Sequence, residues 1–202
     1  MEVKIELIQL KDFSEAMAVL GKAFATQPSS LAIYKGRTPL EIEQIMKNFF
    51  GARLKYLPAQ VYVAKKDGRV VGAMRIVEWP ACHMKTIQML KALPTIMKGR
   101  RLGEMLRWMN MRRKWARKDP EKPHWHLGSL GVIPELQNRG IGSQMMEYYC
   151  DYVDRLKMAA YHETDRPENV KFYERFGFKV VGEEIIMNFP NWYMWRSSND
   201  EK

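Results

Sequence analysis

Residues 137–142, with the sequence QNRGIG, combine the glycines and the positive charge of an anion-binding turn. An apolar run at 127–132 precedes them and predicts a strand, and apolar residues recur every three or four positions over 141–156, which predicts a helix. The first N–H groups of a helix lack partners within the helix, and the helix dipole is positive at that end. Gly140 and Gly142 leave room for a phosphate close to the backbone. We therefore expect a phosphate or pyrophosphate ligand at this turn.

Two common phosphate-binding patterns are excluded by the residues around this turn. A dinucleotide fingerprint would need a third glycine where the chain has Met145. No segment matches the pattern G-x-x-x-x-G-K-[ST] of nucleoside-triphosphate-binding loops. The pattern that is present is Q-x-x-G-x-G after a strand that ends in Gly-Val-Ile-Pro.

That pattern is similar to the acetyl-coenzyme A signature of the GNAT family of N-acetyltransferases. Residues 169–178 (NVKFYERFGF) resemble the second signature of the family, N-x-x-F-Y-E-x-x-G-F, and the two signatures stand in the family's order and at its usual separation. The resemblance covers residues 120–197, whereas the first half of the chain fits only through the order of its elements. PHWHL at 123–127 and WYMWR at 192–196 further resemble the puromycin N-acetyltransferase-like branch.

The resemblance implies a fold of the α/β class. It implies a single N-acetyltransferase domain over residues 1–202, with a mixed, largely antiparallel and twisted sheet flanked by helices. Residues 84–118 would form an extra basic helical insert before the coenzyme-binding strand. The implied function is transfer of an acetyl group from acetyl-CoA to a primary amine of a small molecule, by direct attack of the amine on the thioester.

The resemblance also implies which residues bind the coenzyme. Backbone groups at a bulge in the strand before the glycine turn would hold the pantetheine arm and the thioester, and the N–H of Val132 would stabilise the oxygen that becomes charged. The Asn169 side chain would bond the coenzyme. The full set is Leu130, Gly131, Val132, Gln137, Asn138, Arg139, Gly140, Ile141, Gly142, Ser143, Asn169 and Tyr173.

Two residues are implied to carry the proton transfers. Tyr173 matches the tyrosine that protonates the departing sulfur in many family members, and a phenol holds its proton near neutral pH. The alternative is that Tyr173 is a packed aromatic residue. Glu163 matches a glutamate of the puromycin-like branch and is the candidate base for the ammonium proton. The alternative is a solvated acid at a strand end, and Glu78 is a second candidate for the base.

We expect no metal site. His124, His126 and His162 lack the spacing of zinc-binding motifs, so we interpret them as structural. The two cysteines, Cys82 and Cys150, are too few for a disulfide scaffold. Cys150 stands among tyrosines in a predicted helix, so we interpret it as a packing residue.

Periodicity and turn residues predict the elements that position these residues. In the first half we expect a strand at 3–10, a helix at 13–24, a loop at 27–36, a helix at 39–56, a hairpin of strands at 61–64 and 70–77 around Asp67 and Gly68, and helical structure at 86–115 broken near Pro94 and at 99–103. In the second half we expect a strand at 124–132, a helix from the glycine turn to 158, a strand at 159–164, a helix at 167–176 ended by Gly177, and a hairpin of strands at 179–187 and 192–196 with its turn at 188–191. Alternating strands and helices with two hairpins predict a mixed sheet.

The net charge of +10 is concentrated in residues 85–118, which contain eleven Lys or Arg residues and one acid, Glu104. Three interpretations are open: an amphipathic cover with a solvated cationic face, attraction of the coenzyme phosphates, or contact with nucleic acid or an anionic membrane surface. The family resemblance favours the first, and we expect no nucleic-acid partner. The alternative function is a non-catalytic module that senses coenzyme A or binds nucleic acid.

Composition and patterning also suggest where the protein works. The chain is 46% apolar, and no apolar stretch approaches the length of about 18 residues that a membrane span needs. We expect a cytoplasmic protein without a signal peptide, and a homodimer is compatible with the sequence. The acceptor amine would bind near the 27–36 loop, Tyr34, Trp79, Trp192 and Trp195, whose rings indicate a partly apolar acceptor.

Overall fold

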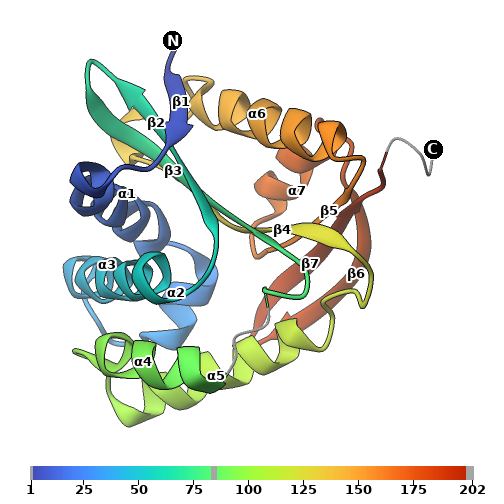
Figure 1. Cartoon of the computed structure of the whole chain (residues 1–202). Coiled ribbons are helices and arrows are strands. Elements are labelled where there is room, and N and C mark those ends of the chain that lie inside the picture. Colours follow the sequence, from blue (N-terminus) through green and yellow to red (C-terminus); the bar gives the residue numbers. More distant parts are fainter. Residues whose placement is uncertain (1, 83–85, 199–202) are drawn as a thin grey trace.

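One twisted sheet of seven strands, in the order β1-β2-β3-β4-β5-β7-β6, forms the centre of the molecule (Figure 1). The computed structural model describes residues 2–82 and 86–198. Neighbouring strands are antiparallel except β4 and β5, which run parallel, so the expected mixed and largely antiparallel sheet is confirmed. The strands are β1 (Lys4–Leu7), β2 (Gln60–Lys66), β3 (Arg69–Glu78), β4 (His124–Val132), β5 (Ala159–Thr164), β6 (Lys179–Ile186) and β7 (Phe189–Arg196).

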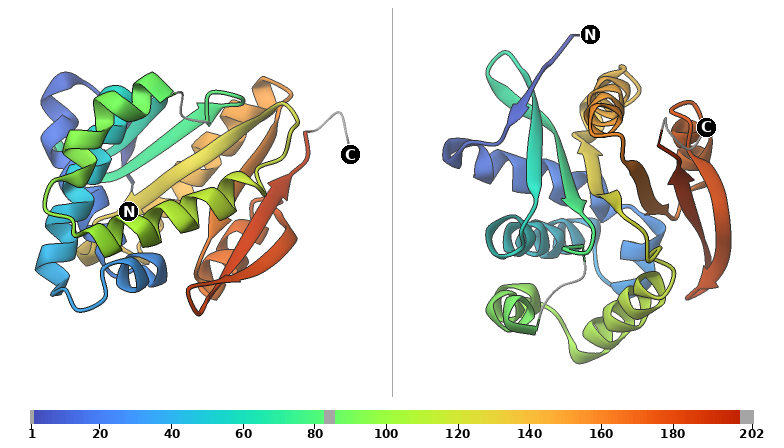
Figure 2. Two further views of the ribbon diagram at one scale, coloured as in Figure 1. Left: turned by 90° about the horizontal axis from the view of Figure 1, so that it is seen from below. Right: turned by 45° about the vertical axis from the view of Figure 1, so that its right-hand side comes forward.

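Helices cover both faces of the sheet (Figures 1 and 2). The α-helices of the described residues are α1 (Phe13–Ala25), α2 (Pro28–Ile33), α3 (Pro39–Tyr56), α4 (Thr86–Met97), α5 (Leu102–Ala116), α6 (Ile141–Arg155) and α7 (Pro167–Glu174). The first five pack on one face and the last two on the other. The alternation of β2 explains the division: Val61 and Val63 join the first core, whereas Tyr62 and Ala64 join the second.

Helix α5 lies on the first face and reaches the far hairpin of the sheet (Figure 2). Near its end, Lys114 Nζ lies 2.6 Å from a carboxylate oxygen of Glu184 on β6. The indole N–H of Trp115 donates to Asn191 on β7 at 3.0 Å. The helical segment that the sequence predicts as an insert is therefore integrated into the core rather than appended to it.

The expectation of a loop at 27–36 is wrong, because this segment contains α2. Pro28 occupies the first turn, where its missing N–H costs nothing, and the N–H of Ser29 donates to Asp165 Oδ2 at 2.8 Å. Ser30 and Ile33 are buried. The polar composition of this segment does not predict a helix, because the contact that stabilises its start comes from Asp165, far along the chain.

Pro94 does not break the helix at 86–115, contrary to expectation. It lies inside α4, and the helix continues through it to Met97. Ala92 and Ile96, on either side of Pro94, are completely or almost completely buried in the first core, so packing outweighs the one hydrogen bond that a proline removes. The second predicted break is confirmed, with Gly99 in the left-handed region at φ 78°.

The turn of the closing hairpin is shorter than the expected 188–191. Met187 and Asn188, both at positive φ, form it, and β7 begins at Phe189 and includes Pro190. Pairing between β5 and β7 ends at Trp192, so Pro190 lies where β7 faces β6 alone. A proline without an N–H is tolerated at such an unpaired edge. The first strand is likewise shorter than expected and ends at Leu7.

Candidate active site

Strands β4 and β5 separate in the middle of the sheet. They pair in parallel only through residues 124–126 and 159–161. Beyond those pairs, β4 keeps β3 on one edge, and none of the described strands pairs with its other edge. The ladder with β3 passes from Leu127 to Ser129, so Gly128 is an extra, bulged residue. We expected the bulge at Leu130, Gly131 and Val132, whereas the structure has it at Gly128.

The glycine turn directly follows β4 and is open to solvent. Residues 137–140 are exposed, and Gly140 is the N-cap of α6 with φ 82°. A Cβ added at Gly140 would meet no atom within 4 Å. Within the described residues, the N–H groups of 138–143 donate to no protein acceptor, and the helical ladder starts with the bond from Gln144 N–H to the Gly140 carbonyl at 3.1 Å. The turn therefore presents a cluster of available N–H donors around empty space.

Side chains near the turn hold it in place. The amide of Gln137 donates to the Val132 carbonyl at 3.0 Å, which ties the turn back to β4. At the opposite side of the opening, the Asn169 amide donates to Thr164 Oγ1 at 3.1 Å and links α7 to the end of β5. Gly131 packs closely against α1, since a Cβ there would lie 3.0 Å from that of Ala23.

Tyr173 lies on α7 and is buried. Its ring packs against His162, with ring centroids 3.8 Å apart, and against Phe178. Within the described residues its hydroxyl has no hydrogen-bond partner. Burial, and the nearby charge of Asp165, raise the pKa of Tyr173 above its ordinary value, so the hydroxyl stays protonated. Burial also lowers the pKa of His162 to about 3, which makes this packed imidazole neutral.

A cavity of about 420 Å³ lies on the first face of the sheet and reaches the opening between the strands. Gly128 and Glu163 line it. Each stands two residues beyond the last pair between β4 and β5, which joins His126 to Tyr161. Its apolar walls include Tyr34, Phe49 and Trp108. The cavity thus connects the proposed coenzyme strand with the candidate base.

Arginines enter this cavity without matched acceptors. A Cβ at Gly128 would lie 3.0 Å from Arg75 Nη1 and 3.4 Å from Arg53 Nη2, so both guanidinium groups crowd the bulge. Arg75 is only 3% exposed and donates from Nη2 to the Pro58 carbonyl at 3.1 Å. The buried Nε atoms of Arg53 and Arg75, and all three buried nitrogens of Arg100, lack a hydrogen-bond partner among the described residues.

The pKa values reflect how incompletely these cations are compensated. Burial, and then the charge of Arg53, lower the pKa of Arg75 to about 8. Burial lowers the pKa of Arg53 to about 10, although the charge of Glu163 opposes the shift. Burial also lowers the pKa of Arg100, whose guanidinium lies over the rings of Tyr34, Phe49 and Trp108. An anion bound in this cavity would reduce the free-energy cost of burying these guanidinium charges without acceptors.

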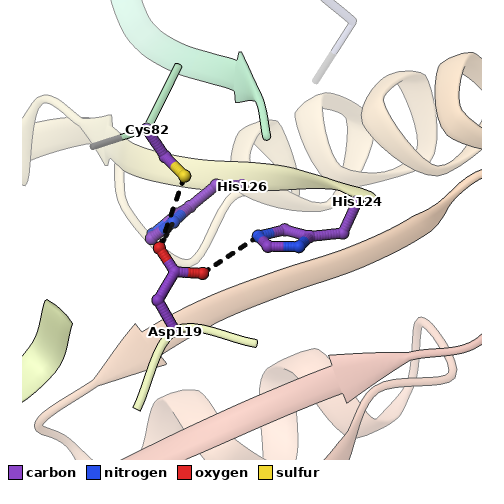
Figure 3. Close-up of side chains that lie close together, drawn as sticks. All are labelled: Cys82, Asp119, His124 and His126. Atoms are coloured by element: carbon purple, nitrogen blue, oxygen red, sulfur yellow. Dashed lines mark hydrogen bonds and ion pairs between the residues drawn. The ribbon is translucent and has the colours of Figure 1, made fainter. Parts of the chain in front are cut away.

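Glu163 belongs to a chain of polar groups along the cavity wall. Its Oε2 lies 3.0 Å from His126 Nε2, and His126 Nδ1 lies 3.5 Å from Asp119 Oδ2. The other oxygen of Asp119 lies 3.1 Å from His124 Nε2, and Cys82 Sγ donates to Asp119 Oδ2 at 3.4 Å (Figure 3). Burial alone would lower the pKa of His124, but its contacts with Asp119, Cys82 and the Lys122 carbonyl outweigh it and raise the pKa to about 9.

Several predicted contributors to the acceptor pocket are elsewhere. Tyr34 lines the cavity, whereas Trp79, Trp192 and Trp195 do not. Trp195 instead packs edge-on to His124. The arginines were missed because residues 53, 75 and 100 are far apart in the sequence and carry no motif. A local signal is present at Arg75, which stands inside the apolar run at 70–77, but it does not indicate a partner for this arginine.

The basic segment is not simply a solvated face. Arg100, Arg112 and Arg113 line the cavity. Arg107 donates from Nε to the Ile33 carbonyl at 2.7 Å, and Arg37 binds the buried Glu104 at 2.7 Å. Part of the positive charge is therefore directed at the cavity and at helix contacts.

Comparison with known proteins gives a consistent result. A model of the acetyltransferase (GNAT) family matches residues 31–178. Similar solved structures include one described as histone acetyltransferase HPA2 and related acetyltransferase from Corynebacterium glutamicum (20% identity, TM-score 0.74, covering 98% of this chain and 97% of that chain). A Drosophila melanogaster polyamine N-acetyltransferase that forms N-acetylagmatine has 14% identity and a TM-score of 0.58, with 96% and 98% coverage. A putative phosphinothricin N-acetyltransferase has 13% identity and a TM-score of 0.57, with 97% and 98% coverage. At these identities the structures show the shared fold.

None of the helices in the described residues has both the length and the apolar character that crossing a lipid bilayer requires.

Proposed function

Since this chain belongs to the acetyltransferase (GNAT) family, we propose that it transfers an acetyl group from acetyl-CoA to a primary amine of a small molecule. The observation that carries the proposal is the turn before α6, where the N–H groups of 138–143 have no protein acceptor among the described residues and surround open space at Gly140. This turn adjoins the opening between β4 and β5, so one extended ligand can reach both. The similarity to a phosphinothricin N-acetyltransferase supports the proposed puromycin-like branch.

We assign the binding of the coenzyme to residues on both sides of the opening. The N–H groups of 138–143 hold the pyrophosphate, Gln137 supports the turn through its side-chain bond to the Val132 carbonyl, and Arg139 adds charge. The free edge of β4 at Leu130, Gly131 and Val132 pairs with the pantetheine arm, as a neighbouring strand would. Asn169 bonds the arm from the side of β5. In this arrangement the N–H of Val132 stabilises the oxyanion.

Tyr173 is the proposed acid that protonates the departing thiolate. Its hydroxyl is protonated and has no protein partner in the described residues, which keeps it available to a ligand. Glu163 is the proposed base on the opposite face of β5, where it borders the cavity and holds His126. Direct attack by the neutral amine then requires no covalent enzyme intermediate.

Replacing Glu163 with glutamine should lower kcat/KM for the amine about 100-fold at neutral pH, because the amine would lose its proton acceptor. The loss should shrink as the pH rises, since a larger fraction of the amine then arrives neutral. Steady-state rates over a pH series measure this. Glu78→Gln is the control, since Glu78 is exposed at the end of β3 and should leave the profile unchanged. A loss of equal size at every pH would assign Glu163 a positioning role instead.

The cavity supports a narrower class of acceptor, an amine that also carries a carboxylate or a comparable anion. Five arginines line the cavity against two acids, Asp119 and Glu163, and both acids already contact His126. A polycationic acceptor such as a polyamine would add charge where compensation is already lacking. A bound carboxylate would instead fill the vacant donors of Arg53, Arg75 and Arg100.

The acceptor class can be tested with pairs of an amino acid and its decarboxylated amine, such as phenylalanine and phenethylamine. The wild-type protein should prefer the amino acid. Arg100→Met should lower kcat/KM for the amino acid roughly 10- to 100-fold, the worth of a hydrogen bond to a charged group, and should change the amine little. Lys98→Met removes a nearby exposed cation and should change neither. Equal losses for both members of a pair would contradict an anion site.

The overall proposal is tested by the release of free coenzyme thiol in a screen of amines. The alternative functions predict different binding. A sensor would bind acetyl-CoA without releasing thiol in the presence of any amine, and a nucleic-acid module would be stabilised against heat by a DNA duplex but not by acetyl-CoA. Stabilisation by DNA alone, weakening steeply with salt, would overturn the enzyme assignment.

A further inference from the structure

Four side chains from three separate segments converge at one end of the cavity wall (Figure 3). Cys82 follows β3, Asp119 follows α5, and His124 and His126 stand two apart on β4, so both rings point to the same face. One potential ligand atom from each residue lies within 4.8 Å of all the others. We propose that these four residues form a binding site for a divalent metal ion, with Zn²⁺ as the ion that the donors suit best. This proposal departs from our sequence-based expectation of no metal.

The second nitrogen of each histidine fixes the direction of its lone pair. His124 Nδ1 lies 2.7 Å from the Lys122 carbonyl, which can only accept, so Nδ1 carries a hydrogen and the neutral ring has its lone pair on Nε2. His126 Nε2 lies 3.0 Å from Glu163 Oε2 and donates to that carboxylate, which leaves the lone pair on Nδ1. Both lone pairs then point into the cluster. A histidine that donates its outer N–H to a carbonyl or a carboxylate is the usual arrangement of a metal ligand.

The contacts between the two histidines and Asp119 lack the geometry of hydrogen bonds. His124 Nε2 and His126 Nδ1 approach the Asp119 oxygens to 3.1 and 3.5 Å, yet neither nitrogen has a hydrogen-bond partner among the described residues. The side chains of Asp119 and His124 are 4% and 0% exposed. With both rings neutral, two lone pairs face the buried Asp119 carboxylate, and this arrangement is repulsive unless a metal ion lies between them or each ring takes up a proton. A metal ion at the centre would be within reach of one ligand atom from each of the four side chains.

The donors select the metal. Two imidazoles, one thiolate and one carboxylate make a mixed nitrogen, sulfur and oxygen set of the kind that Zn²⁺ binds tetrahedrally, with bonds of about 2.0 to 2.3 Å. Ligand atoms at such distances lie about 3.3 to 3.8 Å apart, so only a small contraction of the cluster is needed. With four protein ligands the site is closed. Its role is then to fasten the segments at Cys82 and Asp119 to β4 and, through His126, to orient Glu163.

Two other arrangements use the same residues. Doubly protonated histidines could balance Asp119 without a metal. Cys82 could alternatively act as a nucleophile beside His126: burial and the charge of Asp119 oppose ionisation of its thiol, but the contacts with His124 and His126 outweigh them and lower its pKa. Both alternatives predict that the purified protein binds no metal at these residues, and the nucleophile also predicts acetylated Cys82.

The test uses Zn²⁺ and Co²⁺ alone, with no substrate, so it is independent of the proposed acetyl transfer. The wild-type protein should retain one Zn²⁺ per chain after dialysis, and Co²⁺ should give thiolate-to-metal charge-transfer absorption. Cys82→Ser should abolish that absorption and weaken Zn²⁺ binding by roughly 100-fold or more. The control variant Cys150→Ser, which removes the other cysteine, should keep the bound ion. His126→Gln should weaken binding similarly, and Zn²⁺ should raise the Tm of the wild-type protein but not of either site variant.

Absence of stoichiometric Zn²⁺ in the wild-type protein, or an undiminished affinity in both site variants, would overturn the proposal. Acetylation of Cys82 by acetyl-CoA in metal-free protein, seen by mass spectrometry, would do so in favour of the nucleophile. If a site variant fails to fold, the Co²⁺ spectrum of the wild-type protein alone decides, because only a cysteine ligand produces the charge-transfer absorption.

Discussion

Gly140→Leu is expected to weaken acetyl-CoA binding by roughly 10²- to 10⁴-fold, because two or more charge-assisted hydrogen bonds would be lost, each worth about 1.5 to 3 kcal/mol. Gly140 caps α6, and a side chain there would extend into the space that the N–H groups of 138–143 surround. The leucine would occupy the seat of the pyrophosphate. Calorimetric titration with acetyl-CoA measures the loss.

The chain offers a matched control for this substitution. Gly68 has φ 78°, close to the 82° of Gly140, and a Cβ added there would likewise meet no atom within 4 Å. It lies in the turn between β2 and β3, away from the proposed phosphate seat. Gly68→Leu should therefore cost similar backbone strain, about 1 to 2 kcal/mol, without affecting the coenzyme. Unchanged affinity in Gly140→Leu, or equal losses in the two variants, would be incompatible with the proposed seat.

Tyr173→Phe is expected to reduce kcat by about 10² to 10⁴, the usual contribution of a positioned proton donor, with little change in the KM for acetyl-CoA. The substitution keeps the ring that packs against His162 and Phe178 and removes only the hydroxyl. That hydroxyl makes no hydrogen bond to the described protein groups, so its removal should change the free energy of unfolding little. Initial rates at varied acetyl-CoA concentration give the two constants separately.

Tyr149→Phe provides the contrast. The hydroxyl of Tyr149 donates to the Trp125 carbonyl at 2.7 Å in the buried core. Its loss should destabilise the protein by about 1 to 3 kcal/mol while kcat stays near the wild-type value, so the two tyrosines should show opposite effects. If Tyr173→Phe raised KM as much as it lowered kcat, Tyr173 would belong to coenzyme binding rather than to proton transfer.

The sequence predicted the coenzyme half of the fold well, because there local signals and tertiary structure agree. The bounds of β4 and β5 match the expected strands at 124–132 and 159–164, and α6 begins directly at the glycine turn. A strand, a glycine turn and a helix are each encoded by neighbouring residues. The resemblance to a family therefore rested on the part of the chain where short patterns determine structure.

The acceptor half could not be predicted in the same way. Arg53, Arg75 and Arg100 meet only because α3, β3 and the segment before α5 pack around one cavity. The segment at 27–36 became a helix through a hydrogen bond to Asp165, more than a hundred residues away. Cys82 and Asp119 reach β4 through two separate connections. Such convergence depends on tertiary packing, which no local pattern records.

The short parallel contact between β4 and β5 has a consequence for cooperativity. Three residue pairs between β4 and β5 join the four strands β1 to β4 to the three strands β5 to β7 within the sheet. Helix α5 adds contacts from Lys114 and Trp115 to β6 and β7, but the pairing between β4 and β5 itself is short. A ligand bound between β4 and β5 would hold the two parts of the sheet together. Amide hydrogen exchange in these two strands should therefore slow when acetyl-CoA is present. Binding of acetyl-CoA would then make the two parts of the sheet open and unfold together.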